Sequence, residues 1–351
     1  MKLILRLMIL VFSMMSIVLV VAQDDETTLT VVTYDSFAIS DEVVEQFTAE
    51  TGITLEFLRL ADAGVMVNQS ILSKNNPLGD VLYGVDNTFL SRALNEDLFI
   101  PYEATGLDAI SDEFKLDEGM RVTPVTFGDV CLNYDVAYFE ENELALPESL
   151  MDLTLPEYDG LLVVEDPSIS SPGLAFLLAT VSVFGDEGDY TYLDYWADLL
   201  ENDVLVVNGW TEAYYGEFTA ASEDGDRPLV VSYASSPPAE VLFGDPELET
   251  APTGAIVADD TCFRQIEFIG ILDGTENLDA AQQFVDFVIG TTFQEDLPLQ
   301  MFVFPVNAEA ELPEIFIEYA QVPENPVNMS IELIDENRET WIRAWTQVVL
   351  R

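Results

Sequence analysis

The strongest constraint on the fold is a regular alternation of two hydrophobic patterns in the first hundred residues. Apolar runs typical of buried strands alternate with segments whose apolar residues recur at helical spacing. Ser40 and Asp41 are typical of a helix start, and Gly52 of a helix end. Strands are expected at 28–34, 53–60 and 79–86, with helices at 41–50, 64–75 and 87–98. This order predicts an α/β domain with a largely parallel sheet.

The second half of the chain repeats this pattern with different turn residues. Apolar runs at 160–165, 203–207 and 227–233 each lead into a helix pattern, and Pro172 stands where the longest of these helices would start. Even without its first 22 residues, a chain of 351 residues is long for a single hydrophobic core. Two domains are therefore expected.

Residues 1–22 have the composition of an export signal peptide. Lys2 and Arg6 precede an apolar run, and Val20 and Ala22 place small side chains before Gln23. The run is also nearly long enough to stay in the membrane as an uncleaved anchor, which remains the alternative. No cysteine stands near residue 22, so a lipid-modified cysteine there is excluded. We expect cleavage, export and a soluble mature protein.

The charge of the chain excludes several classes of partner. The sequence has 12 lysines and arginines, 65 aspartates and glutamates, no histidine, and a formal net charge of −53. Such a surface repels nucleic acids and anionic membranes. The absence of histidine removes the commonest general base and metal ligand, which disfavours an enzyme. A content of 49% apolar and 11% aromatic residues argues against disorder.

The two cysteines, Cys131 and Cys262, stand 131 positions apart. In an exported chain they are free to pair as a structural disulfide, and two buried thiols are the alternative. Neither belongs to a spacing typical of a zinc site.

Polar and aromatic residues gather directly after four of the expected strands. These turns hold Tyr34-Asp35-Ser36, the serines within 168–171, Gly209-Trp210-Thr211, and Tyr233 followed by two serines. Ligands of open α/β sheets bind at the carboxyl ends of strands, so we expect one binding site there. The aromatic faces suit a cationic ring, and Asp35 could balance its charge. The serine-rich helix start favours a hydroxyl or a small phosphate.

Six motifs carry a resemblance to a known family over nearly the whole chain after the signal. They are VVTYDSF (31–37), GDVLYGVDNTFLSRA (79–93), EDPSISSPGL (165–174), VNGWTEAYYGEF (207–218), VVSYASSPPAE (230–240) and FVFPVN (302–307). In content, order and spacing they resemble the thiamine-binding periplasmic proteins of ABC importers, within the type II solute-binding group. The resemblance implies two α/β lobes joined by a hinge, with lobe 1 at 28–130 and 265–351 and lobe 2 at 131–264.

The resemblance also implies a monomer that binds thiamine or its phosphates between the lobes, without cofactor or catalysis, and delivers it to a membrane permease. The ligand-binding residues implied are Tyr34, Asp35, Gly64, Ser170, Ser171, Trp210, Tyr214, Tyr233 and Phe302. The aromatic residues would hold the ring, and Ser170 and Ser171 the hydroxyl or phosphate. Segments 130–134 and 261–270 would cross between the lobes, which would bring Cys131 and Cys262 together in a disulfide.

Two other ligands stay open within the same fold. An iron(III) site would use tyrosines, and Tyr214-Tyr215 is the adjacent pair that keeps this possibility alive. A polyamine site would need several carboxylates, for which Asp35, Asp62, Asp86 and Glu212 are candidates. A hydrolase with paired carboxylates gains no support, because 65 acidic residues form chance pairs in any fold.

Overall fold

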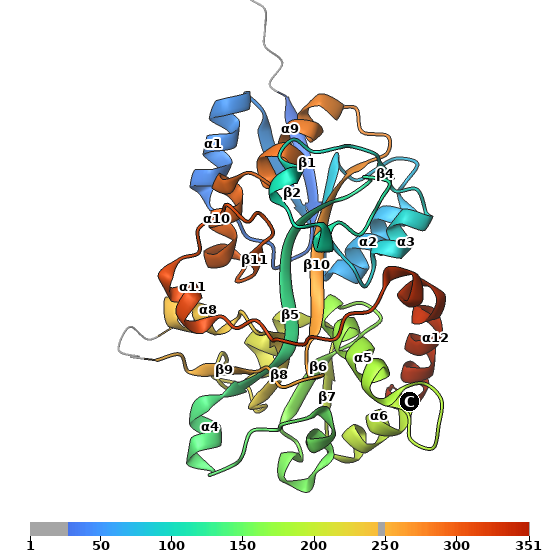
Figure 1. Ribbon diagram of the computed structural model, residues 1–351, viewed down its shortest axis with the longest axis vertical. Coiled ribbons are helices and arrows are strands. Elements are labelled where there is room, and N and C mark those ends of the chain that lie inside the picture. Colours follow the sequence, from blue (N-terminus) through green and yellow to red (C-terminus); the bar gives the residue numbers. More distant parts are fainter. Residues whose placement is uncertain (1–26, 245–249, 351) are drawn as a thin grey trace, which may run out of the picture.

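The computed structural model describes residues 27–244 and 250–350, and these form two lobes joined by two long strands (Figure 1). The signal peptide expected at 1–22 lies outside the described residues. Within the described ranges, no helix has the length and apolar character needed to cross a membrane.

Lobe 1 contains the strands and helices predicted at the start of the chain, together with two helices from its last quarter (Figure 1). Ser40 caps the first helix with its side chain, and Gly52 ends it at a φ of 74°. The elements are β1 (Thr28–Thr33), α1 (Asp41–Thr51), β2 (Thr54–Arg59), α2 (Ala63–Leu72), β3 (Val81–Asp86), α3 (Leu90–Asn95), β4 (Phe99–Ile100), η1 (Leu107–Ala109), η2 (Asp112–Phe114), α9 (Leu278–Val288), α10 (Thr291–Gln300) and β11 (Phe304–Pro305).

Lobe 2 is built around three strands and the long apolar helix α5 (Ser171–Phe184), whose first turn contains Pro172 as predicted. Eleven successive residues of α5, from Ser171 to Val181, are buried, so the helix forms the centre of this lobe. Its other elements are α4 (Val136–Glu141), η3 (Leu150–Thr154), η4 (Pro156–Tyr158), β6 (Leu162–Glu165), α6 (Tyr192–Glu201), β7 (Leu205–Val207), α7 (Trp210–Glu212), the π-helical turn η5 (Ala213–Glu217), β8 (Leu229–Tyr233), α8 (Pro237–Phe243) and β9 (Thr253–Ile256).

Strands β5 (Thr123–Asp135) and β10 (Phe263–Leu272) run from one lobe into the other and pair with each other (Figure 1). The sheet order is β2-β1-β3-β10-β5-β8-β6-β7. The outer strands of each lobe are parallel, as predicted, but β5 and β10 are antiparallel to each other and to their neighbours. The sheet is therefore mixed, because two strands that cross a hinge in opposite directions cannot both follow the parallel order.

The predicted disulfide is confirmed. Cys131 and Cys262 form a bond with their Cα atoms 4.3 Å apart. The register of the crossing strands explains the pairing, since Val130 lies opposite Phe263 and the cysteines are the next residues outward. Both cysteines are fully buried.

The chain ends in α11 (Glu314–Tyr319) and α12 (Ile331–Val349). Helix α12 packs against α6 of lobe 2 and α3 of lobe 1, and the Trp345 ring meets the Trp196 ring edge-on with 5.4 Å between centroids. The C-terminal helix thus contacts both lobes. The lobe boundaries expected from the sequence, 28–130 with 265–351 and 131–264, stay a prediction.

Candidate functional site

A cavity of about 350 Å³ lies between the lobes. Its size falls within the range of small-molecule pockets. Seven of the nine predicted ligand-binding residues line it: Tyr34, Asp35, Ser171, Trp210, Tyr214, Tyr233 and Phe302. The turns after β1, β6, β7 and β8 therefore meet at one place, as the strand-end rule led us to expect.

The other two predicted residues, Gly64 and Ser170, do not line this cavity. Ser170 is fully buried, and its hydroxyl caps α5 by accepting a bond from the Gly173 N–H at 3.5 Å. Gly64 donates its N–H to the Ile169 carbonyl of the other lobe at 3.0 Å. A Cβ at Gly64 would lie 2.5 Å from that carbonyl oxygen, so glycine allows the lobes to approach. Both residues support the wall of the cavity.

Tyr34 stands at the end of β1 with its ring against the backbone of β3. Gly84 has a φ of 99°, and a Cβ there would overlap the Tyr34 ring. The Tyr34 hydroxyl lies near Glu267, and burial together with this carboxylate raises the pKa of Tyr34. The tyrosine thus stays neutral and presents a fixed ring to the cavity.

The aromatic wall consists of Trp210, Tyr214 and Tyr215. Trp210 stacks on Tyr214 with centroids 5.0 Å apart and planes inclined by 21°. Tyr215 meets Trp210 edge-on, and the indole N–H of Trp210 donates to the Ser232 hydroxyl at 2.9 Å. Tyr214 is buried among apolar residues of β6, β7 and β8. The wall is therefore held in place by packing behind it.

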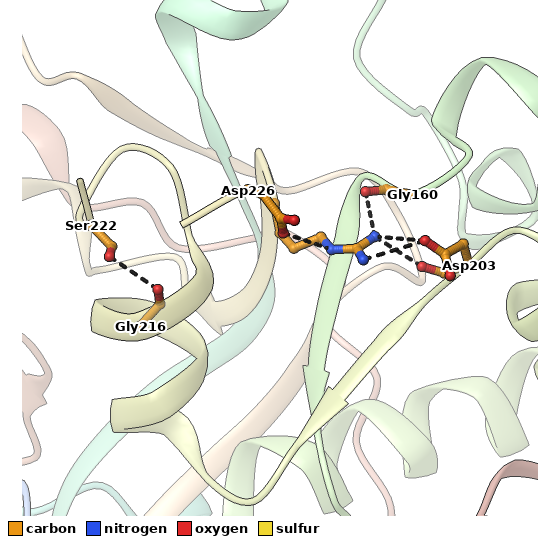
Figure 2. A network of polar contacts seen from close by, with 6 residues as sticks. Gly160, Asp203, Gly216, Ser222 and Asp226 are labelled. Atoms are coloured by element: carbon orange, nitrogen blue, oxygen red, sulfur yellow. Dashed lines mark hydrogen bonds and ion pairs between the residues drawn. The ribbon is translucent and has the colours of Figure 1, made fainter. Parts of the chain in front are cut away.

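Polar contacts fix the loop that follows this wall (Figure 2). Ser222 donates its hydroxyl to the Gly216 carbonyl at 3.0 Å. The Arg227 guanidinium donates to the Gly160 carbonyl at 2.5 Å and forms ion pairs with Asp203 and Asp226. One of the few cations of the chain is thus used to hold the loop together.

A second aromatic contact joins the lobes at another part of the cavity. Phe243 of α8 meets Phe302 edge-on with centroids 5.8 Å apart, and both line the cavity. Phe302 has a φ of 53°, a left-handed conformation that is uncommon for residues other than glycine. Phe243 is 71% exposed, so this contact lies at the surface.

Two polar residues of β10, Gln265 and Glu267, also line the cavity and were not predicted. Gln265 donates its side-chain amide to the Tyr233 hydroxyl at 2.8 Å, and Thr126 donates to Glu267 at 2.7 Å. Burial raises the pKa of Glu267 to about 7. A glutamine and a glutamate two positions apart in a largely apolar strand are the signal that could have revealed them, since such residues share one face.

Asp62 is another carboxylate that was not among the predicted thiamine-binding residues. The sequence analysis named it only as a candidate for a polyamine site. It caps α2 by accepting the Ala63 N–H at 2.7 Å, and it accepts the N–H groups of Ser171 and Trp210 at 3.3 Å each. It lines the main cavity and a neighbouring one of about 480 Å³. Burial raises its pKa to about 6.

The chemistry of the cavity is that of a cation site with flat aromatic faces. Among the described residues, those that line it include Asp35, Asp62 and Glu267 but no lysine or arginine. Nor do the described residues contain a group of three histidine, cysteine, aspartate or glutamate side chains arranged for a metal ion. Tyr214 and Tyr215 use their rings to pack with Trp210.

Comparison with known proteins places this geometry in a family. Residues 76–323 match the model described as bacterial extracellular solute-binding protein. The chain belongs to this family. The thiamine-binding periplasmic protein of Escherichia coli (strain K12) is 29% identical over 332 residues, which cover 92% of this chain and 94% of that protein. The protein of the same name from Brucella suis is 27% identical and covers 98% and 99% of the two chains.

Solved structures support the same assignment for this solute-binding protein. A structure named periplasmic thiamin binding protein superimposes with a TM-score of 0.79 at 28% identity, covering 92% of this chain and 96% of that one. The two-lobed type II periplasmic-binding-protein fold expected from the sequence is therefore confirmed.

Proposed function

We propose that the protein binds thiamine in the cavity between its lobes and delivers it to the permease of an ABC importer. The observation that carries the proposal is the pairing of a stacked aromatic wall with carboxylates in a cavity whose described lining holds no basic residue. Thiamine joins a cationic thiazolium ring to an aminopyrimidine, so it offers two flat rings and a positive charge. The near full-length similarity to thiamine-binding periplasmic proteins supports this choice of ligand.

In this proposal, different residues contact different parts of the ligand. Trp210 and Tyr34 contact the rings, with Tyr214 behind Trp210, while Tyr233 and Phe302 close the remaining sides. Asp35 and Glu267 balance the positive charge. Ser171 lies near the hydroxyethyl group. The protein acts as an exported, periplasmic monomer and as a carrier without catalysis.

Isothermal titration calorimetry tests the proposal. The purified protein is unfolded and refolded to remove any ligand that co-purifies, then titrated with thiamine, spermidine and ferric citrate. Binding of thiamine with no heat from the other two is the expected result. Binding of spermidine without thiamine would replace the proposal by polyamine transport, and a coloured ferric complex would replace it by iron transport.

A further inference from the structure

Helix α5 begins at the cavity wall, where the sequence led us to expect room for a hydroxyl or a phosphate. Ser171, its first residue, lines the cavity, and the start of a long helix attracts anions through its free N–H groups. The structure shows that an anion of the protein itself already stands there.

That anion is Asp62, which comes from lobe 1. Its Oδ1 accepts the Ser171 N–H, and its Oδ2 accepts the Trp210 N–H, each at 3.3 Å. A Cβ at Gly209 would lie 2.8 Å from Oδ2, so the glycine makes room for this carboxylate. Asp62 thereby takes up the backbone donors that a phosphate would need.

Two further carboxyl groups surround the same helix start. The Ser171 hydroxyl donates to Asp86, which is fully buried and also accepts the Thr88 N–H at 2.7 Å. Glu165 is fully buried at the end of β6, and neither of its carboxyl oxygens has a hydrogen-bond partner among the residues that the structure describes. Its backbone carbonyl lies beside α5, 2.6 Å from where a Cβ of Gly173 would stand. Burial raises the pKa of Asp86 and of Glu165 and favours their neutral forms, so Asp62 is the group that brings negative charge to the place where a phosphate tail would sit.

We infer that Asp62 makes this cavity select the unphosphorylated form of its ligand. The inference rests on the proposed function and narrows it to free thiamine. A phosphate monoester carries a charge of about −1.5 to −2 at neutral pH. To enter, it must displace Asp62 from the α5 N–H group or stand beside it, and the repulsion of like charges rejects it. A neutral hydroxyl meets no such repulsion and can donate to a carboxylate. We expect thiamine monophosphate to bind about 10- to 100-fold more weakly than thiamine.

Calorimetric titration of Asp62→Asn with both ligands tests this. The amide keeps the size of the side chain and one acceptor oxygen but removes the charge. The expected result is a fall of at least fivefold in the affinity ratio of thiamine to thiamine monophosphate. Glu103→Gln is the matched control, because it removes one negative charge from an exposed residue that does not line the cavity. In this control, the ratio of the affinity for thiamine to the affinity for thiamine monophosphate should equal that of the unmodified protein.

Each outcome decides between the inference and the function on which it rests. Equal binding of both ligands by the unmodified protein, or an unchanged ratio in Asp62→Asn, would overturn the selection by Asp62 and leave thiamine binding intact. If the unmodified protein binds neither thiamine nor thiamine monophosphate, both the proposed function and the inference are overturned. Thiamine binding by Asp62→Asn also shows that this variant folds.

Discussion

The aromatic wall and the carboxylates of the cavity are built in opposite ways. Trp210, Tyr214 and Tyr215 lie within six consecutive positions and pack on one another. Asp62 and Glu267 come from segments 205 positions apart, which only the folded sheet brings together. The wall is a local structure that packing holds in place, whereas the carboxylates depend on how the lobes and the hinge meet. The two parts should therefore respond differently to substitution and to pH.

The largest expected effect is that of Glu267→Gln on the pH dependence of stability. Folded Glu267 keeps its proton up to about pH 7, whereas its ordinary pKa is 4.5. Its contribution to stability is complete below pH 4.5 and is lost as the pH rises through 7. The difference corresponds to about 3 kcal/mol. The variant should lose less stability than the unmodified protein between pH 5 and pH 8 in urea unfolding.

Glu103→Gln is the control for this prediction, because Glu103 is exposed and lies outside the cavity. Its pH profile should match that of the unmodified protein. If Glu267→Gln shows the same pH dependence as this control, Glu267 does not hold its proton in the folded state.

Trp210→Ala tests the aromatic wall. Removal of the indole should weaken thiamine binding by about 1–3 kcal/mol, because a flat aromatic face stabilises a cationic ring in a desolvated site. The affinity is measured by calorimetry, and Trp341→Phe serves as the control, because Trp341 lies on α12 and does not line the cavity. An unchanged affinity in Trp210→Ala would mean that the ligand lies elsewhere.

Tyr34→Phe tests both parts of the comparison, because it keeps the aromatic ring and removes the hydroxyl near Glu267. This hydroxyl lowers the pKa of Glu267, so its removal should raise that pKa further. Thiamine affinity should fall by about 1 kcal/mol, the usual net value of one hydrogen bond. The loss should grow as the pH falls toward 6, and a loss independent of pH would show that the hydroxyl acts separately from Glu267.

The smallest effect concerns the long-range field of the acidic surface. A net charge of −53 should speed the arrival of a cation, so the association rate should fall several-fold between low and physiological salt. Stopped-flow tryptophan fluorescence measures the rate. An association rate that does not change with salt would mean that the acidic surface does not attract the ligand, and that only charges in the cavity act on it.

The sequence predicted what depends on neighbouring residues. The alternation of strands and helices, the Ser40 cap and the Pro172 helix start are local patterns, and the structure contains all three. Tyr34, Trp210 and Tyr233 were predicted because each stands at the end of an apolar strand, and all three line the cavity. The antiparallel hinge strands and the position of Asp62 depend on contacts between distant segments, which leave no periodic signal. Ser170 was predicted to contact the ligand, and in the structure its hydroxyl caps α5, because a helix cap and a ligand contact use the same residue type.

The disulfide between Cys131 and Cys262 limits how the lobes can separate. It joins the two crossing strands, so one strand cannot slide along the other and their register stays fixed. The lobes can then open the cavity by rotating about the hinge, but not by sliding along the strands. The parts of the wall farthest from the bond travel the longest arcs, and the width of the entrance is set by how far the hinge bends.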